Sequence, residues 1–190
     1  REAGATVHTT NTFRTRERTC GSAWRALAER AAALAWAGAG DGRVAGCIAP
    51  LEDCYEPGRS IGAASEAEHR RLAEVLAPHC DLLLCETFAH PDEALAAVRA
   101  ATATGRPVWL ALTAGPDASL LTPAAMGELA RQAVDLGVGA VLVNCTPALD
   151  TRRFLEAIAG CGVSIGAYAN AGHVDDEIGW TASPEPGAEN

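Results

Sequence analysis

Short apolar runs alternate with amphipathic segments along most of this sequence, and that alternation limits the folds open to the chain. Six runs have the length and composition of β-strands, and most are continuously apolar, as in strands covered on both faces. They span residues 5–9, 43–48, 81–86, 107–112, 139–144 and 163–168. Between them apolar residues recur at helical spacing, as at Leu72, Val75 and Leu76. The pattern predicts an α/β fold built on a parallel sheet.

Two helix starts and one long connection carry their own sequence signals. Thr122 followed by Pro123 predicts an N-cap with proline at the first helical position, and Ser65 with Glu68 predicts a capping box. The Gly/Pro-rich stretch 51–64 is too long for a minimal strand-to-helix connection. We therefore predict an active-site loop there, with a tolerated surface insertion as the alternative.

Composition excludes several classes of function. The net charge of −9 argues against nucleic acid or an anionic membrane as a partner. All fifteen basic residues are arginine, so the chain has no lysine amine for Schiff-base chemistry or a P-loop. The seven cysteines show no disulfide-scaffold spacing, and no signal peptide or apolar membrane span is present. A cytoplasmic protein acting on a small molecule is the expectation.

Polar residues follow the predicted strands, where a parallel α/β fold places its reactive groups. The surrounding strings are "GATVHTTNTFR", "VAGCIAP", "DLLLCETF", "GAVLVNCTP" and "YANAG". In this order, over nearly the whole chain, they resemble the homocysteine S-methyltransferase family. The resemblance implies a (β/α)₈ TIM-barrel type of fold. A barrel enzyme using phosphate-bearing substrates is disfavoured, because the sequence has no Gly-rich phosphate loop before a late helix.

The resemblance also implies a zinc ion held by three cysteine thiolates. Zinc deprotonates a thiol that is mostly protonated at neutral pH, yet leaves it nucleophilic. The implied reaction is transfer of a methyl group from a sulfonium, quaternary amine or folate donor to the homocysteine thiol, giving methionine. The sequence does not identify the donor.

Four residues take site roles by resemblance. Cys145 in "VNCTP" matches a zinc cysteine, although a lone cysteine after an apolar strand is otherwise a small buried hydrophobe. Glu86 in "CETF" matches the glutamate that contacts the homocysteine amino group, the alternative being a charge at a helix N-terminus. Asn11 and Asn170 match pocket asparagines, and hydrogen bonds within their own turns are as plausible a role.

Other residues with reactive side chains receive structural interpretations. Cys47 and Cys85 lie at strand ends, and Cys85 should point away from Glu86 by strand alternation, so we expect both to pack in the interior. His8, inside a strand, is expected to be structural. His173 follows "NAG" and is a weak ligand candidate.

The sequence departs from the family pattern at both ends. It lacks the first strand, with its "DGG"-type string, and the late "GGCC" string that carries two of the three zinc cysteines. About six of the eight βα units are therefore expected, as a partial barrel over 1–173 followed by a mobile acidic tail over 174–190. A lone thiolate cannot hold catalytic zinc, so we expect this chain alone to be inactive unless Cys47, Cys85 or a partner chain supplies further ligands. The alternative is a non-catalytic relative that acts as a binding or assembly partner, with homo-oligomers forming through open barrel edges.

Overall fold

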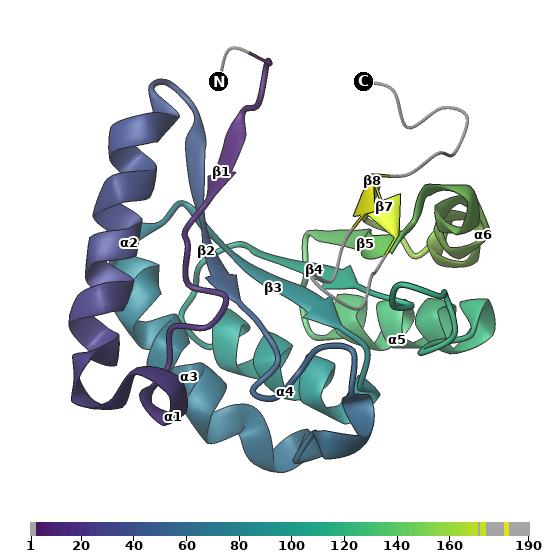
Figure 1. The fold of residues 1–190 in the computed structure, drawn as a ribbon, viewed down its shortest axis with the longest axis horizontal. Helices are drawn as coiled ribbons and strands as arrows, with labels where there is room; N and C mark the ends of the chain where they lie inside the picture. The colour runs from purple at the N-terminus through teal and green to yellow at the C-terminus, as the bar shows by residue number, and fades with distance from the viewer. Residues whose placement is uncertain (1–2, 171, 174–180, 183–190) are drawn as a thin grey trace.

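The fold is an open, curled sheet of six parallel strands with helices on its outer face (Figure 1). The computed structural model describes residues 3–170, 172–173 and 181–182. In spatial order, which is also chain order, the strands are β1 (Val7–Thr9), β2 (Arg43–Ile48), β3 (Leu82–Phe88), β4 (Val108–Leu112), β5 (Ala140–Pro147) and β6 (Ser164–Asn170). Each pairs in parallel with the next. All six predicted strands are confirmed, and the sheet is a partial TIM barrel of the α/β class.

Helices connect successive strands and cover the convex side of the sheet (Figure 1). They are α1 (Glu17–Cys20), α2 (Trp24–Ala39), α3 (Glu66–Leu76), α4 (Pro91–Thr102), α5 (Pro123–Asp135) and α6 (Ala148–Ile158). Short 3₁₀ turns cover Gly21–Ala23, Pro57–Arg59, Gly62–Ser65 and Ala77–His79. Within the described part of the chain, no helix combines the length and apolar character needed to cross a membrane.

Strand alternation divides the buried side chains between two cores. Residues such as Val44, Leu83 and Cys85 point outward and pack with the helices in the larger core. Their neighbours point to the barrel interior, where a small core forms from Ala45, Leu82, Leu84 and Ala111. Since both faces of β2 to β5 are largely buried, the continuous apolar runs of these strands are accounted for.

The two predicted helix starts have different outcomes. Thr122 caps α5 as predicted, because its hydroxyl accepts from Ala125 N at 3.2 Å. Ser65 directly precedes α3, but its hydroxyl donates to Gly62 O at 2.6 Å, so the predicted capping box is wrong. The physical reason is that Ser65 ends a 3₁₀ turn and already has helical φ and ψ, which leaves its side chain unable to reach the helix N–H groups.

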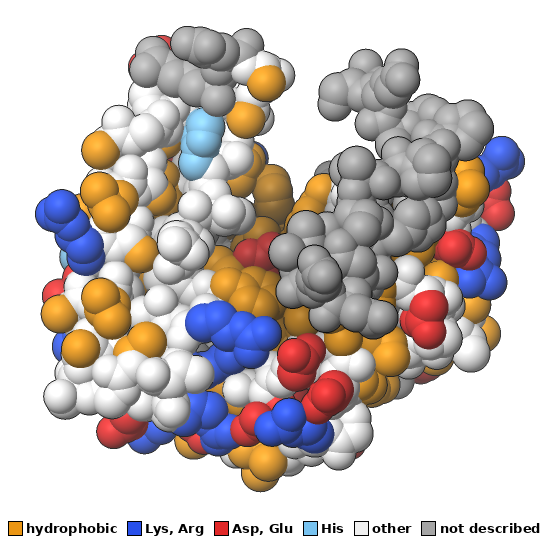
Figure 2. All heavy atoms as spheres, viewed as in Figure 1, with side chains coloured by type: hydrophobic (Ala, Val, Ile, Leu, Met, Phe, Trp, Pro, Cys, Tyr) orange, Lys and Arg blue, Asp and Glu red, His pale blue; other side chains and the backbone are white. Residues whose placement is uncertain are grey.

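The curled sheet leaves a hollow on its inner side (Figure 2). Figure 2 shows hydrophobic side chains and an acidic group on the floor of this hollow. At the edges, β1 and β6 each pair with one strand of the described sheet, and Ile165 on β6 is 43% exposed. Leu27 and Leu34 on α2 are also exposed. Association through these edges stays a prediction.

Beyond β6 the structure describes one further pairing. Gly172–His173 (β7) and Thr181–Ala182 (β8) pair as antiparallel strands. The rest of 174–190, where the sequence predicts a mobile tail, lies outside the described residues, as does the side chain of His173.

Candidate functional site

The carboxyl ends of β2, β3, β5 and β6 bring titratable and amide side chains together; we call this region the barrel mouth. Glu86 in β3 is half-buried on the inner face, since Leu82 and Leu84, two and four residues earlier, face the interior. The Tyr168 hydroxyl of β6 donates to Glu86 Oε2 at 2.9 Å. Burial raises the pKa of Tyr168 far above its usual value, and the Glu86 carboxylate adds to that shift. The pair therefore consists of a neutral phenol that orients a carboxylate.

Cys47 and Cys85 occupy opposite faces near Glu86. Cys85 is fully buried in the core against the helices, as predicted from strand alternation. Cys47 is 1% exposed, and its pKa is raised by burial and then by the adjacent Glu86 carboxylate. Burial thus favours the neutral form of both thiols.

Cys145 lies at an irregularity in β5, where the register with β6 shifts between Asn144 and Pro147. Its φ is 49°, a left-handed conformation that non-glycine residues rarely adopt. Asn144 Nδ2 lies 3.2 Å from Cys145 Sγ. Burial raises the pKa of the thiol, while hydrogen bonds from Thr87, Tyr55 and Asn144 oppose that shift. A short apolar strand thus delivers a partly buried sulfur surrounded by hydrogen-bond donors.

Asn144 and Thr87 connect Cys145 to β3. The Asn144 amide also donates to Thr87 Oγ1 at 2.7 Å, and Thr113 Oγ1 donates to Cys145 O at 3.0 Å. Asn144 is fully buried, and its Oδ1 has no hydrogen-bond partner among the described residues. The mouth therefore retains one buried acceptor beside the sulfur.

Two tyrosines complete the mouth, and neither was predicted from the sequence as a site residue. Tyr55, from the predicted active-site loop, is hydrogen-bonded to Cys145 and lies next to Asn170, and burial raises its pKa. The pKa of Cys54, next to Tyr55, is raised to about 11 by burial, by the adjacent Asp53 and by the nearby Cys145. The length of the loop was the available signal for Tyr55, and the alternation of β6, with Tyr168 two residues before Asn170, was the signal for the other.

Asn11 lies apart from this cluster. It is exposed and lines a hollow of about 480 Å³ between the end of β1 and α2, together with Thr9, Leu27 and Leu34. The structure thus brings Glu86, Cys145 and Asn170 to one mouth and leaves Asn11 on the neighbouring edge. His8 packs against Gly42, with its ring 2.8 Å from the position of a Cβ added there, and its buried Nε2 has no hydrogen-bond partner among the described residues. A structural role for His8 stays a prediction.

The described residues contain no group of three His, Cys, Asp or Glu side chains placed to hold a metal ion. Cys145 contributes a single sulfur, whereas a zinc site needs three or four protein ligands. The described part of the chain therefore does not fit zinc by itself.

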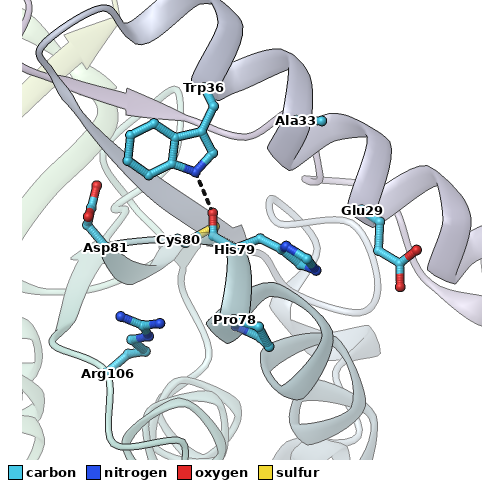
Figure 3. A pocket seen from close by; sticks show the side chains of 8 residues that line it. All are labelled: Glu29, Ala33, Trp36, Pro78, His79, Cys80, Asp81 and Arg106. Atoms are coloured by element: carbon cyan, nitrogen blue, oxygen red, sulfur yellow. Dashed lines mark hydrogen bonds between the residues drawn. The ribbon is translucent and has the colours of Figure 1, made fainter.

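A second hollow, of about 390 Å³, lies at the opposite end of the sheet. Its walls come from α2 and from the residues that precede β3 and β4 (Figure 3). Trp36 closes one side and donates from its indole nitrogen to His79 O at 2.7 Å. No site residue predicted from the sequence lines it, and Asp81 is engaged with Val44 N at 2.8 Å.

The chain is similar in sequence to known homocysteine methyltransferases. The family described as "Homocysteine S-methyltransferase" matches residues 1–189. Betaine–homocysteine S-methyltransferase 1 of Bos taurus is 32% identical over 123 residues, which are 62% of this chain and 29% of that protein. S-methylmethionine–homocysteine S-methyltransferase BHMT2 of Pongo abelii is 31% identical over 147 residues, 75% of this chain and 39% of that protein.

The chain thus spans about a third of the length of these curated relatives. Among solved structures, a type I 3-dehydroquinate dehydratase from Clostridium difficile aligns with a TM-score of 0.50 at 12% identity. That alignment covers 83% of this chain and 66% of the other, and it reflects the shared barrel fold alone. Since the family match covers nearly every residue, the chain belongs to the homocysteine S-methyltransferase family.

Proposed function

We propose that the barrel mouth binds homocysteine and that this chain takes part in transferring a methyl group to its thiol, giving methionine. The observation that carries the proposal is the Glu86 carboxylate, held by Tyr168 on the inner face and close enough to Cys145 for their charges to interact. Family membership and the names of the two relatives support homocysteine as the acceptor.

Each mouth residue has a role in this proposal. Glu86 pairs with the ammonium group of the amino acid, since a charge-assisted hydrogen bond in a partly desolvated site is strong. Tyr168 fixes the carboxylate, and the Asn170 amide orients the ligand. The buried Asn144 Oδ1 offers an acceptor to a ligand N–H group.

Zinc belongs to the proposal only through Cys145, as one thiolate ligand. The other ligands would have to lie outside the described residues or on another molecule, because the described residues provide no three-ligand group. For that reason no step is assigned to the metal, and this chain's own part is to bind and orient the acceptor.

For the methyl donor we propose a sulfonium or quaternary amine in preference to a folate. The relatives are named for betaine and S-methylmethionine, which both carry a methyl group on a cationic centre. A net charge of −9 is compatible with cationic ligands.

Calorimetric titration with L-homocysteine in zinc-containing buffer tests the proposal. We expect binding to weaken about 10- to 100-fold in Glu86→Gln, because a hydrogen bond to a charged group is lost. Cys145→Ser should also weaken it. The matched controls are Glu128→Gln, an exposed carboxylate on α5, and Cys161→Ser, a half-buried thiol beyond α6. Absence of binding to the unmodified chain, or equal affinities of Glu86→Gln and Glu128→Gln, would reject it.

A non-catalytic assembly role is the second candidate, and the exposed Ile165 on the edge strand β6 favours it. It predicts an oligomer that Ile165→Glu dissociates, observed by sedimentation velocity. A monomer at all concentrations contradicts this second role.

A further inference from the structure

The mouth loop, residues 51–60, places Tyr55 against Cys145 and Asn170, yet its own anchors lie in the next βα unit. Glu93, in the first turn of α4, contacts the loop at both ends. Leu51 N donates to Glu93 Oε1 at 2.7 Å, and Ser60 Oγ donates to Glu93 Oε2. One carboxylate thus fixes two loop positions nine residues apart.

Burial distinguishes Glu93 from an ordinary acidic residue at a helix N-terminus. Its exposed fraction is 1%, whereas a carboxylate that only complements the helix dipole usually faces water. Burial alone would raise its pKa, but the neighbouring His69 and the hydrogen bonds from Ser60 and Leu51 outweigh it and lower the pKa. The group is therefore a buried carboxylate stabilised by its hydrogen-bond donors, both of which belong to the loop.

Two further buried basic groups surround the same carboxylate. His69 Nε2 lies 3.3 Å from Glu93 Oε1, and the imidazole is 1% exposed. Arg16, 6% exposed, donates to Ala49 O at 3.3 Å and to Pro50 O, directly before the loop. Ala49 and Pro50, the two residues directly before the loop, are thus held by a buried side chain. Arg59, by contrast, is exposed and contacts Glu52 and Glu56.

From these contacts we infer that Glu93 is the positioning residue that holds the mouth loop, and with it Tyr55, over Cys145. Glu93 acts through Leu51 and Ser60 and does not touch the mouth itself. The inference rests on the proposed function only for its statement that the mouth is where the substrate binds; the anchoring itself is independent of any ligand.

Limited trypsin digestion tests the anchoring. The chain has no lysine, so trypsin cleaves it only after arginine, and the exposed Arg59 lies inside the loop. Arg152, 87% exposed in the middle of α6, reports unfolding of the whole domain. We expect cleavage after Arg59 to accelerate about tenfold in Ser60→Ala and in Glu93→Gln, with little change after Arg152. Ser60→Thr, which restores the hydroxyl, should return the rate toward that of the unmodified chain.

The control is Ser119→Ala, which removes a surface serine hydroxyl bonded to Asp117 and should leave Arg59 protected. A second readout is alkylation by iodoacetamide, which should become faster at Cys145 than at Cys161 once Tyr55 is released. The inference is overturned if Ser60→Ala leaves cleavage after Arg59 unchanged, or if cleavage after Arg59 and Arg152 accelerates equally. Since neither readout requires homocysteine, a failure of the proposed function leaves these results interpretable.

Discussion

Thr87 and Cys145 both have a left-handed backbone, with φ of 66° and 49°, and their Oγ1 and Sγ atoms lie 4.0 Å apart. Each residue lies where its strand shifts register against a neighbour. The conformation is unfavourable for a β-branched residue such as threonine, so the surrounding contacts must maintain it. The Asn144 amide does so by donating to both side chains. Backbone strain is thus concentrated at the mouth, as is common at functional sites.

Replacing Thr87 by valine keeps the side-chain shape but removes the acceptor for Asn144. We expect the free energy of unfolding to fall by about 1–3 kcal/mol, because a fully buried amide loses a partner. Thr102→Val is the control, since the Thr102 hydroxyl only bonds carbonyls of its own helix, and it should cost less than about 0.5 kcal/mol. Urea denaturation measures both, and equal losses would contradict the proposed link between β3 and β5.

The two tyrosines of the chain, Tyr55 and Tyr168, should resist ionisation in the folded state. Burial raises both pKa values, and the Glu86 carboxylate adds to the shift at Tyr168. A group whose pKa is raised by folding stabilises the fold below its unfolded pKa and ceases to do so as the pH rises toward the folded pKa. Stability should therefore decline above about pH 10, where tyrosines of the unfolded chain lose their protons.

Tyrosinate absorbance during an alkaline titration measures this directly. The folded chain should show little tyrosinate absorbance up to about pH 10. In denaturant, both tyrosines should ionise with a midpoint of about pH 10. Tyr168→Phe assigns the remaining signal to Tyr55. A folded-state midpoint near the ordinary tyrosine value would show that neither phenol is held as the structure indicates.

The sheet was predictable from sequence because most of its strands are continuous apolar runs, which tertiary contacts reinforce. The Thr122 cap was predictable for a similar reason, since its signal is local. The Ser65 capping box was not, because Ser65 ends a 3₁₀ turn in which its hydroxyl already donates to Gly62 O. The capping pattern in the sequence does not distinguish a helix start from such a turn.

The candidate site likewise contains residues that the sequence pattern predicts and residues that distant contacts place. Glu86, Cys145 and Asn170 lie near the carboxyl ends of their strands, so the parallel topology places them at one edge of the sheet. The position of Tyr55 at the mouth could not be predicted from the sequence, because it depends on two loop anchors supplied by α4. Tyr168 required knowledge of its pairing with Glu86 across the curled sheet, which spans 82 positions in sequence. The sequence pattern gives strand order but not the curvature that brings β6 toward β3.

Gly127 in α5 provides a test of helix packing in which two effects have opposite signs. Glycine to alanine normally stabilises a helix by up to about 1 kcal/mol. At Gly127, however, an added Cβ would lie 2.6 Å from Ala157 O of α6, and a backbone atom cannot rotate away. We therefore expect Gly127→Ala to lower the free energy of unfolding by about 1–3 kcal/mol. Gly38→Ala in α2, where nothing lies within 4 Å of the added Cβ, should raise it. Thermal or urea denaturation compares the two variants, and a stabilised Gly127→Ala would mean that α5 and α6 do not pack this closely.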